Sequence, residues 1–217
     1  MDQGLRGFVG QGMDGRKAAV PAIVAMYLPG AHSFRPTVPG FYKFVLWGPG
    51  GSEVAAGGLG SGGSGAYVEI TKPLAAGQVV ALVVSDYGAP TTATFPDGKV
   101  ASAGHGADCP GGGAGGVGGA ATGGDVNLDG ATGGSSVGPA QAALGTAPGA
   151  PGSGNNAGAG APANLPFRGG RGGNPYTTAS ITTNPQAPGG GGGAAGSASS
   201  VKNGSGMVIV QLVRTAQ

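Results

Sequence analysis

Glycine recurs at every third position in short runs between residues 112 and 173, and this spacing restricts the possible folds more than any other feature. Two columns run through 112, 115, 118 and through 113, 116, 119, and a shorter pair lies at 130 and 133. The chain has 52 glycines in 217 residues, where about 7% is usual. Each glycine inside a helix costs about 1 kcal/mol relative to alanine. The composition therefore predicts a chain without substantial α-helix.

Strand-like segments lie on both sides of the glycine-rich stretch. Aromatic and β-branched residues cluster in short runs, and Pro/Gly pairs separate them. The apolar run at 78–85 predicts a strand that is covered on both faces. Short strands with frequent turn signals predict an all-β, jelly-roll-like β-sandwich. The predicted strands are 20–28, 41–47, 66–71, 78–85, 93–95, 100–103 and 207–213.

The last predicted strand fixes the domain organisation. Residues 207–213 (MVIVQLV) are too apolar to be left exposed, so we expect this strand to pair with the strand block at 33–103. Residues 104–196 then form a long glycine-rich insertion within one β-domain, 31–217. A loose loop of that length inside a compact domain is uncommon. Residues 1–30 are expected to form an N-terminal arm that serves for attachment.

The insertion has two interpretations. Glycine at every third residue places bare faces on a left-handed extended helix with three residues per turn, and bare faces let neighbouring backbones approach closely. We therefore predict polyglycine-II helices in 104–196. The alternative is a flexible low-complexity insert.

Segments richer in side chains interrupt the glycine runs between 139 and 188, and these would connect the glycine helices. Loops on a rigid scaffold are where recognition is usually found. Aromatic, Arg, Asn and Thr side chains are typical of adaptable contact surfaces. The candidate receptor-contact residues are Asn164, Phe167, Arg168, Arg171, Tyr176, Thr177 and Asn184.

Residues with catalytic or metal-binding chemistry are sparse. The chain has 2 histidines and 1 cysteine, and zinc would need a fourth ligand beside His105, Asp108 and Cys109. A turn with a buried or idle thiol is the favoured interpretation there. No glycine run is followed by the lysine and helix of a phosphate-binding loop. We expect no enzyme activity, no catalytic or metal site and no cofactor.

Charge and hydropathy exclude two further classes of partner. A formal net charge of +2 without a basic run disfavours binding to nucleic acid. The apolar run 20–28 is well short of the roughly 18 residues of a membrane span, so we expect no membrane insertion. The N-terminus lacks a basic region followed by an apolar core, and we expect no signal peptide.

Several short motifs follow one another in a fixed order along about residues 33–213. They are SFRPTVPG at 33–40, FYKFVLWGPGG at 41–51, GGSGAYV at 62–68, PLAAGQ at 73–78, ASAG at 101–104, GGDVN at 123–127 and GSGMVIV at 204–210. This order resembles the glycine-rich domains of tailed-phage tail-fibre and tail-tip proteins. The glycine-rich domain of the anaplastic lymphoma kinase receptor is similar in outline.

The resemblance implies a virion protein of a bacteriophage, assembled in the host cytoplasm. Some relatives are receptor-binding adhesins of the polyglycine-II type, which present variable loops to the host. We expect contacts with other virion proteins through the arm and β-domain, and with a host cell-surface protein or glycan. A homo-oligomer, with a trimer favoured, is expected.

Two alternatives to an adhesin stay open. The first is a non-adhesive virion structural protein of the head, collar or tail-assembly fibre. The second is an elastic or coat protein with a disordered insert.

Overall fold

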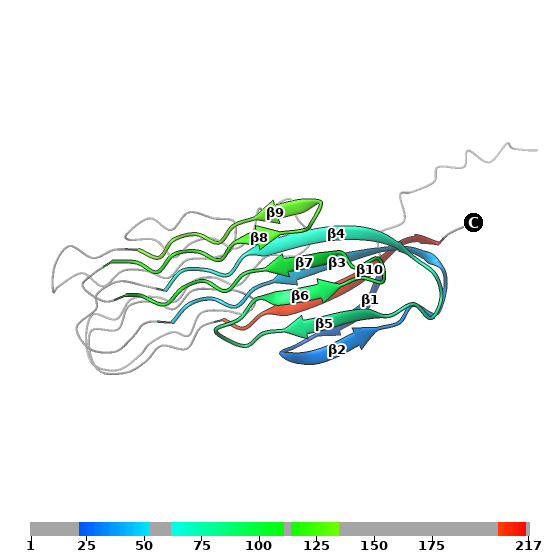
Figure 1. The fold of residues 1–217 in the computed structure, drawn as a ribbon, viewed down its shortest axis with the longest axis horizontal. Helices are drawn as coiled ribbons and strands as arrows, with labels where there is room; N and C mark the ends of the chain where they lie inside the picture. Colours follow the sequence, from blue (N-terminus) through cyan, green and yellow to red (C-terminus); the bar gives the residue numbers. More distant parts are fainter. Residues whose placement is uncertain (1–21, 53–61, 111–113, 135–203, 216–217) are drawn as a thin grey trace, which may run out of the picture.

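The computed structural model describes residues 22–52, 62–110, 114–134 and 204–215, and these form two antiparallel five-stranded sheets without a helix (Figure 1). The predicted all-β class is confirmed over these residues, and the jelly-roll connectivity stays a prediction. In spatial order, sheet A consists of β1 (Ala22–Tyr27), β10 (Met207–Thr215), β3 (Gly40–Trp47), β4 (Tyr67–Leu74) and β9 (Val126–Leu128). Sheet B consists of β2 (Gly30–Phe34), β5 (Val80–Val84), β6 (Thr91–Thr94), β7 (Val100–Ala103) and β8 (Ala121–Thr122).

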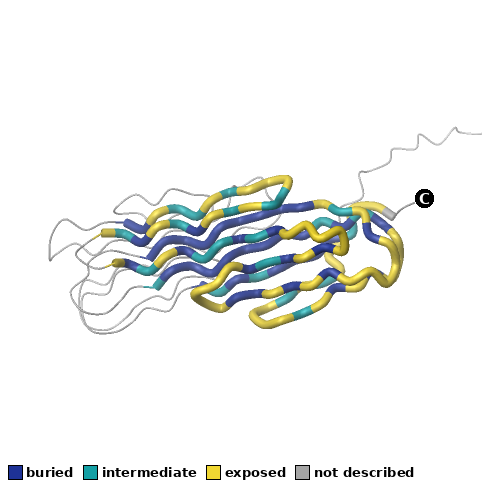
Figure 2. Tube along the Cα trace, viewed as in Figure 1, coloured by how far each residue is buried: buried dark blue, intermediate teal, exposed yellow. Residues whose placement is uncertain are grey.

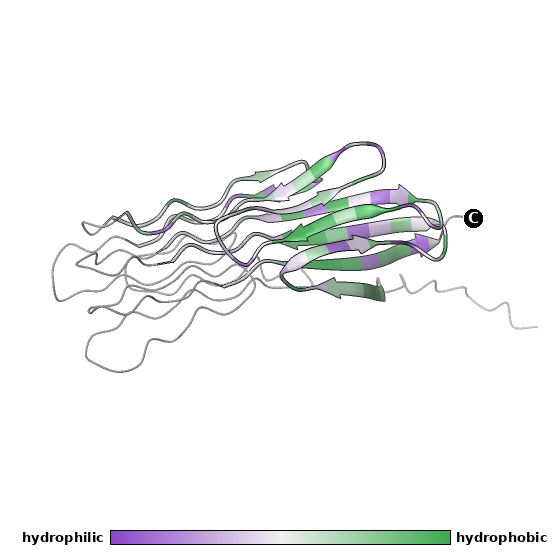
Figure 3. Cartoon of the chain, turned by 60° about the horizontal axis from the view of Figure 1, so that its bottom comes forward, coloured by the Kyte–Doolittle hydropathy of each residue, from purple (hydrophilic) through white to green (hydrophobic). Residues whose placement is uncertain are grey.

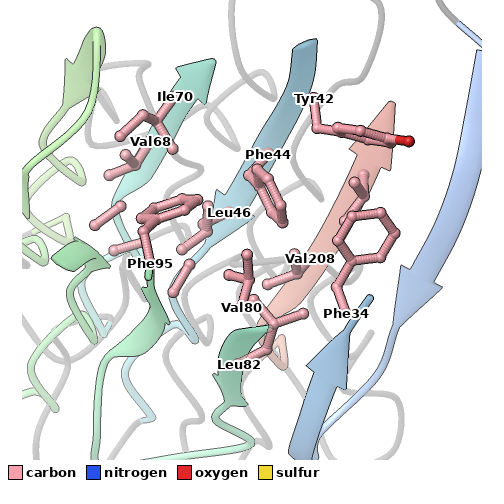
Figure 4. Packing of buried hydrophobic residues seen from close by; sticks show 14 of the residues in the cluster. Phe34, Tyr42, Phe44, Leu46, Val68, Ile70, Val80, Leu82, Phe95 and Val208 are labelled. Carbon is pink, nitrogen blue, oxygen red and sulfur yellow. The ribbon is translucent and has the colours of Figure 1, made fainter. Parts of the chain in front are cut away.

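The two sheets enclose one hydrophobic core (Figure 4). Phe34 of β2 meets Phe44 of β3 edge to face, with 5.6 Å between ring centroids. Phe44 also meets Phe95, which follows β6, at 5.1 Å. Edge-to-face pairs stabilise a core beyond the area they bury. Leu82 and Val208 complete the contact from β5 and β10, so the core joins segments far apart in the sequence.

β10 pairs as expected, with the first strand block. It lies between β1 and β3, and Val208 is opposite Leu46 while Val210 is opposite Phe44. Both valines are 0% exposed. The prediction that the apolar C-terminal strand is buried in the β-domain is confirmed.

The prediction that β5 is covered on both faces is wrong. Its residues alternate strictly between buried and exposed. Val80, Leu82 and Val84 point into the core, whereas Val83 is 50% exposed. The continuous apolar run suggested burial of both faces because the outward-facing residues of this strand are apolar as well. Figure 3 shows hydrophobic and hydrophilic residues mixed along several of the strands.

The N-terminal part of the sandwich begins earlier than the expected boundary near residue 30. β1 corresponds to the strand expected at 20–28, and it pairs with β10 from Ala22 to Tyr27. Residues 22–30 are therefore part of the sandwich, and residues 1–21 lie outside the described residues. β2, β8 and β9 had no counterpart among the predicted strands. The expected turn at 96–98 is present, with Gly98 at φ 78° and its N–H donating to the Phe95 carbonyl.

The two ends of the sandwich differ. Ala22 lies opposite Leu212 and Gly40 lies opposite Thr215, at the end where both terminal segments leave. Trp47 lies opposite Met207 and Tyr67 at the other end. From that second end the chain continues as glycine-rich extensions of the strands (Figure 1). The described part of the molecule is therefore elongated, with the β-sandwich at one end and the glycine-rich extensions at the other.

Candidate functional site

The extensions form a compact array of chain segments without strand structure, here called the glycine array. Each segment continues directly from a strand or leads into one. Segment 48–52 leaves β3, 62–66 enters β4, 104–110 leaves β7 and 114–120 enters β8. Segment 129–134 leaves β9, and 204–206 enters β10.

The array repeats every third residue. Along 114–120 the burial runs exposed, intermediate, buried, and the same order then recurs. Residues 105–110 follow the same three-residue cycle. A strand would alternate with a period of two, whereas a left-handed extended helix has three residues per turn. The backbone geometry of the array therefore differs in kind from that of the sheets.

Backbone hydrogen bonds connect the segments with the same period. The Gly48 N–H donates to the Ala66 carbonyl at 2.9 Å, and three residues later Gly51 donates to Gly63 at 2.7 Å. On the next pair of segments, Gly63 donates to Ala107 and Ala66 donates to Gly104, both at 2.9 Å. The bonds continue outward through 104–110 and 114–120 to 129–134. Segment 62–66, fully buried, lies within this network (Figure 2).

Close approach of the backbones explains why these positions are glycine. A Cβ added to Gly48 would lie under 3.0 Å from the Gly104 carbonyl oxygen, and one added to Gly51 would meet the Ala107 carbonyl equally closely. Real Cβ atoms essentially never come that close to another heavy atom. The same conflict arises with a neighbouring backbone at Gly62, Gly63, Gly65, Gly104, Gly106, Gly115, Gly116, Gly118, Gly119 and Gly130. Packing in the array thus rests on the absence of side chains.

The chain leaves and re-enters the array at its end away from the sandwich. Segments 48–52, 104–110 and 129–134 run outward from the sheets, and 62–66, 114–120 and 204–206 run back. The connections 53–61, 111–113 and 135–203 therefore begin and end on array segments (Figure 1). All the predicted receptor-contact residues fall in 135–203. Asn164, Phe167, Arg168, Arg171, Tyr176, Thr177 and Asn184 lie outside the described residues, as does most of the predicted insertion.

A cluster of side chains joins the base of the array to sheet B. Tyr87, in the loop 85–90 between β5 and β6, donates its hydroxyl to Asp108 Oδ2. The Ser52 backbone N–H donates to Asp108 Oδ1 at 2.7 Å. The Tyr87 ring meets the His105 ring edge to face, 5.0 Å between centroids. We call Ser52, Tyr87, His105 and Asp108 the junction cluster.

The surroundings of the junction cluster favour the uncharged forms of His105 and Tyr87, which lie beside the carboxyl group of Asp108. Burial lowers the pKa of His105 below its usual value, and the nearby Asp108 and the Gly50 carbonyl oppose this shift. The hydrogen bond to Asp108, together with burial, raises the pKa of Tyr87. His105 Nε2 is buried and has no hydrogen-bond partner among the described residues. At neutral pH the imidazole is therefore uncharged.

Cys109 follows Asp108 in the sequence and is buried, 1% exposed, as predicted. The predicted turn is wrong, because residues 104–110 form a segment of the array without a turn. Its thiol lies 3.1 Å from the Ala114 carbonyl. The described part of the chain contains no group of three or more His, Cys, Asp or Glu residues arranged to hold a metal ion.

A second buried polar group lies on the outer face of sheet A. Lys43 forms an ion pair with Glu69, and the Tyr67 hydroxyl donates to the same carboxylate. Burial, and then Glu69, raise the pKa of Tyr67 far above its usual value. Beside them Trp47 and Tyr67 pack edge to face at 5.3 Å, within a smaller cluster that includes Val45 and Ile209. This group lies on the strands β3 and β4 of sheet A, next to their continuation into the array.

Sequence reasoning missed two parts of this architecture. Residues 48–51 (Gly-Pro-Gly-Gly) predicted only the end of a strand, yet the chain continues into the array. The three-residue spacing of glycine at 48 and 51, and at 62 and 65, carried the signal. Tyr87 gave no such signal, because its partner Asp108 is distant in the sequence.

No protein-family model matches the chain, and no curated protein matches it. No helix among the described residues is long and apolar enough to cross a membrane.

Proposed function

We propose that the protein is a bacteriophage virion protein and acts as a receptor-binding adhesin at a tail fibre or tail tip. The observation that carries the proposal is the position of the array. Its segments end at residues 52, 62, 110, 114, 134 and 204, at the end of the molecule opposite Ala22 and Thr215. A rigid stalk with connecting segments at one end and attachment segments at the other suits a protein that joins a particle to a surface.

The array supplies the rigidity that such a stalk needs. Its three-residue burial period and its hydrogen bonds between segments support a bundle of polyglycine-II helices. Interlocked backbones leave little freedom for the ends of each connection. A contact surface whose ends are held in this way loses less entropy when it binds a partner.

The chemistry of the connection 135–203 suits recognition by shape, hydrogen bonds and aromatic contact. Phe167 and Tyr176 supply aromatic anchors, and Arg168 and Arg171 supply forked donors that match carboxylates and sugar hydroxyls. A formal net charge of +2 offers little long-range steering. The proposed partner on the host is therefore a surface protein or a glycan, bound at short range.

The attachment end would contact other virion proteins. Ala22, the first residue of β1, and Thr215, the last residue of β10, both lie at that end, away from the array. A homo-oligomer formed through this end, with a trimer favoured, is part of the proposal. No enzymatic activity and no cofactor are proposed.

The test is adsorption of virions that carry replaced contact residues. Phe167, Arg168 and Tyr176 are changed together to serine, and a control changes Gln141, Leu144 and Thr146 in the same connection to serine. We expect the first set to reduce adsorption at least tenfold with normal particle yield, and the control set to leave adsorption unchanged. Normal adsorption by both sets would contradict the adhesin proposal and favour a non-adhesive structural protein of the virion.

Binding of the purified full chain to host cells further distinguishes an adhesin from a non-adhesive virion protein. An adhesin binds cells without the rest of the particle, and the triple-serine variant loses that binding. A non-adhesive head, collar or fibre component binds particles that lack it and does not bind cells. Slow amide exchange across segments 48–52 and 62–66 would support the polyglycine-II bundle, and fast exchange there would favour an elastic protein with a disordered insert.

A further inference from the structure

Three chain segments that come from different sheets meet at the junction cluster. Segment 48–52 continues from β3 of sheet A, segment 104–110 continues from β7 of sheet B, and loop 85–90 connects β5 to β6. Most bonds inside the array join backbone to backbone. At the junction, in contrast, side chains of Tyr87, His105 and Asp108 make the contacts. The array also bonds loop 85–90 through the backbone, where the Gly206 N–H donates to the Ser85 carbonyl at 2.9 Å. The contact of segments 48–52 and 104–110 with Tyr87, in contrast, depends on groups that can change charge.

His105 occupies the least favourable position in this cluster for a charge. Its Nε2 is buried and lacks a hydrogen-bond partner among the described residues. The Tyr87 ring packs edge to face against the imidazole ring of His105, with an interplanar angle of 82°. The nearest carboxylate is Asp108, whose Oδ1 accepts from the Ser52 N–H and whose Oδ2 accepts from the Tyr87 hydroxyl. Both oxygens of Asp108 thus already accept a hydrogen bond while His105 is neutral.

We propose that His105 is a pH-sensitive latch that holds the glycine array against loop 85–90 at neutral pH and loosens it in mild acid. One proton, taken up from water at Nε2, creates a positive charge and a buried N–H without an acceptor. A buried donor left without a partner is costly, and a buried charge more so. The charged ring can recover by turning to Asp108 or to water. Either movement displaces the Tyr87 ring and breaks the Tyr87–Asp108 hydrogen bond.

The charged and titratable neighbours of His105 come from two of the three segments. Loop 85–90 contributes Asp86 and Tyr87, and segment 104–110 contributes Asp108 and Cys109. Segment 48–52 has no titratable side chain. The raised pKa of Tyr87 keeps its hydroxyl neutral across the relevant range. Asp108 favours the imidazolium and burial disfavours it, and burial has the larger effect on the pKa.

The direction of the pH effect follows from the lowered pKa. His105 in the unfolded chain has the ordinary pKa of 6.5, and the folded state holds its proton less tightly. The stabilising contribution is therefore fully present above pH 6.5 and is lost as the pH falls through the folded pKa.

The chain provides its own control, because it has 2 histidines. His32 lies in β2, where its Nε2 is 2.8 Å from the Leu28 carbonyl, away from the array. The experiment compares the full-length protein with His105→Asn and with His32→Asn. Proton NMR follows the titration of each imidazole, and hydrogen exchange gives the protection factors of array amides such as Gly51, Gly63 and Ala107 at pH 7 and pH 5.

We expect His105 to titrate below 6.5, and the array protection factors to fall at least tenfold from pH 7 to pH 5 in the wild type and in His32→Asn. In His105→Asn the protection should be the same at both pH values. A His105 titration at or above 6.5, or equal array protection at both pH values in the wild type, overturns the latch.

Tyr87→Phe is a second variant that tests the proposal even if His105→Asn does not fold. It removes the hydroxyl that bonds Asp108 and retains the aromatic ring. We expect this variant to show lower array protection at pH 7 than the wild type and a smaller further loss at pH 5. Wild-type protection at both pH values in Tyr87→Phe would contradict a latch that acts through Asp108.

Discussion

The sandwich and the glycine array solve the same packing problem in opposite ways. In β5 of the sandwich every second residue is buried, and side chains such as Leu82 fill the space between the sheets. In segment 114–120 of the array every third residue is buried, and the buried positions are glycines. The sandwich is stabilised by packing of buried side chains. The array is stabilised by close packing of backbones, which the absence of side chains at its glycines permits. Substitutions that remove or add a single group should therefore have opposite consequences in the two regions.

The largest expected effect is the loss of a core ring from the sandwich. Phe44 is 0% exposed and meets both Phe34 and Phe95 edge to face. Phe44→Ala should lower the free energy of unfolding by about 3–5 kcal/mol, because it removes transfer energy and leaves a cavity. Urea unfolding measures this loss. Phe41→Ala is the control, since Phe41 lies on the same strand and is only half-buried, and a similar loss there would contradict the distinction.

The reverse substitution, addition of one methyl group, should damage the array. Gly51→Ala places a Cβ under 3.0 Å from the Ala107 carbonyl oxygen, and a backbone atom cannot move aside as the end of a side chain can. We expect a loss of about 1–3 kcal/mol, which is typical of overpacking. Lower amide protection should be concentrated in 48–52 and 104–110.

A glycine at a turn of the sandwich provides the matched control for Gly51→Ala. Gly77 has a φ of 80° but nothing within 4 Å of an added Cβ. Gly77→Asn suits that conformation, because asparagine tolerates the left-handed region better than other residues. It should leave the array amides unchanged. Equal losses in both variants would show that glycine matters for its conformation and not for close backbone approach.

Strands of the sandwich could be predicted from sequence where the local pattern was strong. β3, with its aromatic run, and β10, with its apolar run, matched the expected positions within a few residues. β8 and β9 have two and three residues, and such short elements form only because the neighbouring strands hold them. The pattern therefore contained too little information to predict them.

The array could be predicted only in part. The three-residue spacing at 112–119 correctly indicated a threefold repeat, which the burial of 114–120 displays. Residues 48–51 carry the same composition as a turn, so composition could not distinguish a chain that reverses from one that runs on. Of the junction cluster, the sequence brought together only His105 and Asp108, since Tyr87 and Asp108 meet only through the packing of sheet B against the array.

A smaller effect is expected for the ion pair on sheet A, where polar side chains are partly buried. Lys43 neutralises Glu69, whose exposed fraction is 6%. Lys43→Ala removes the cation and leaves a buried carboxylate that keeps the Tyr67 hydroxyl as a donor. Because the lysine side chain is 21% exposed and water can replace part of its contact, we expect a loss of about 1–2 kcal/mol in urea unfolding. Lys43→Arg should recover most of it, and no recovery would contradict a role for the charge.

The smallest expected effect concerns the exposed ion pair at the end of the sandwich opposite the array. Lys72 of β4 pairs with Asp97 in the turn between β6 and β7, and this hydrogen bond lowers the pKa of Asp97 below its usual 3.8. A carboxyl with a lowered pKa contributes stability above its unfolded pKa and loses it as the pH falls through the folded value. Asp97→Asn should therefore unfold at a slightly lower temperature than the wild type at pH 6. The two proteins should converge as the pH falls below the folded pKa of Asp97, and 1 M salt should reduce the difference at pH 6, because exposed pairs are screened. A difference that persists once the carboxyl is protonated would mean that Asp97 acts through its bond to the Lys99 N–H in the turn and not through its charge.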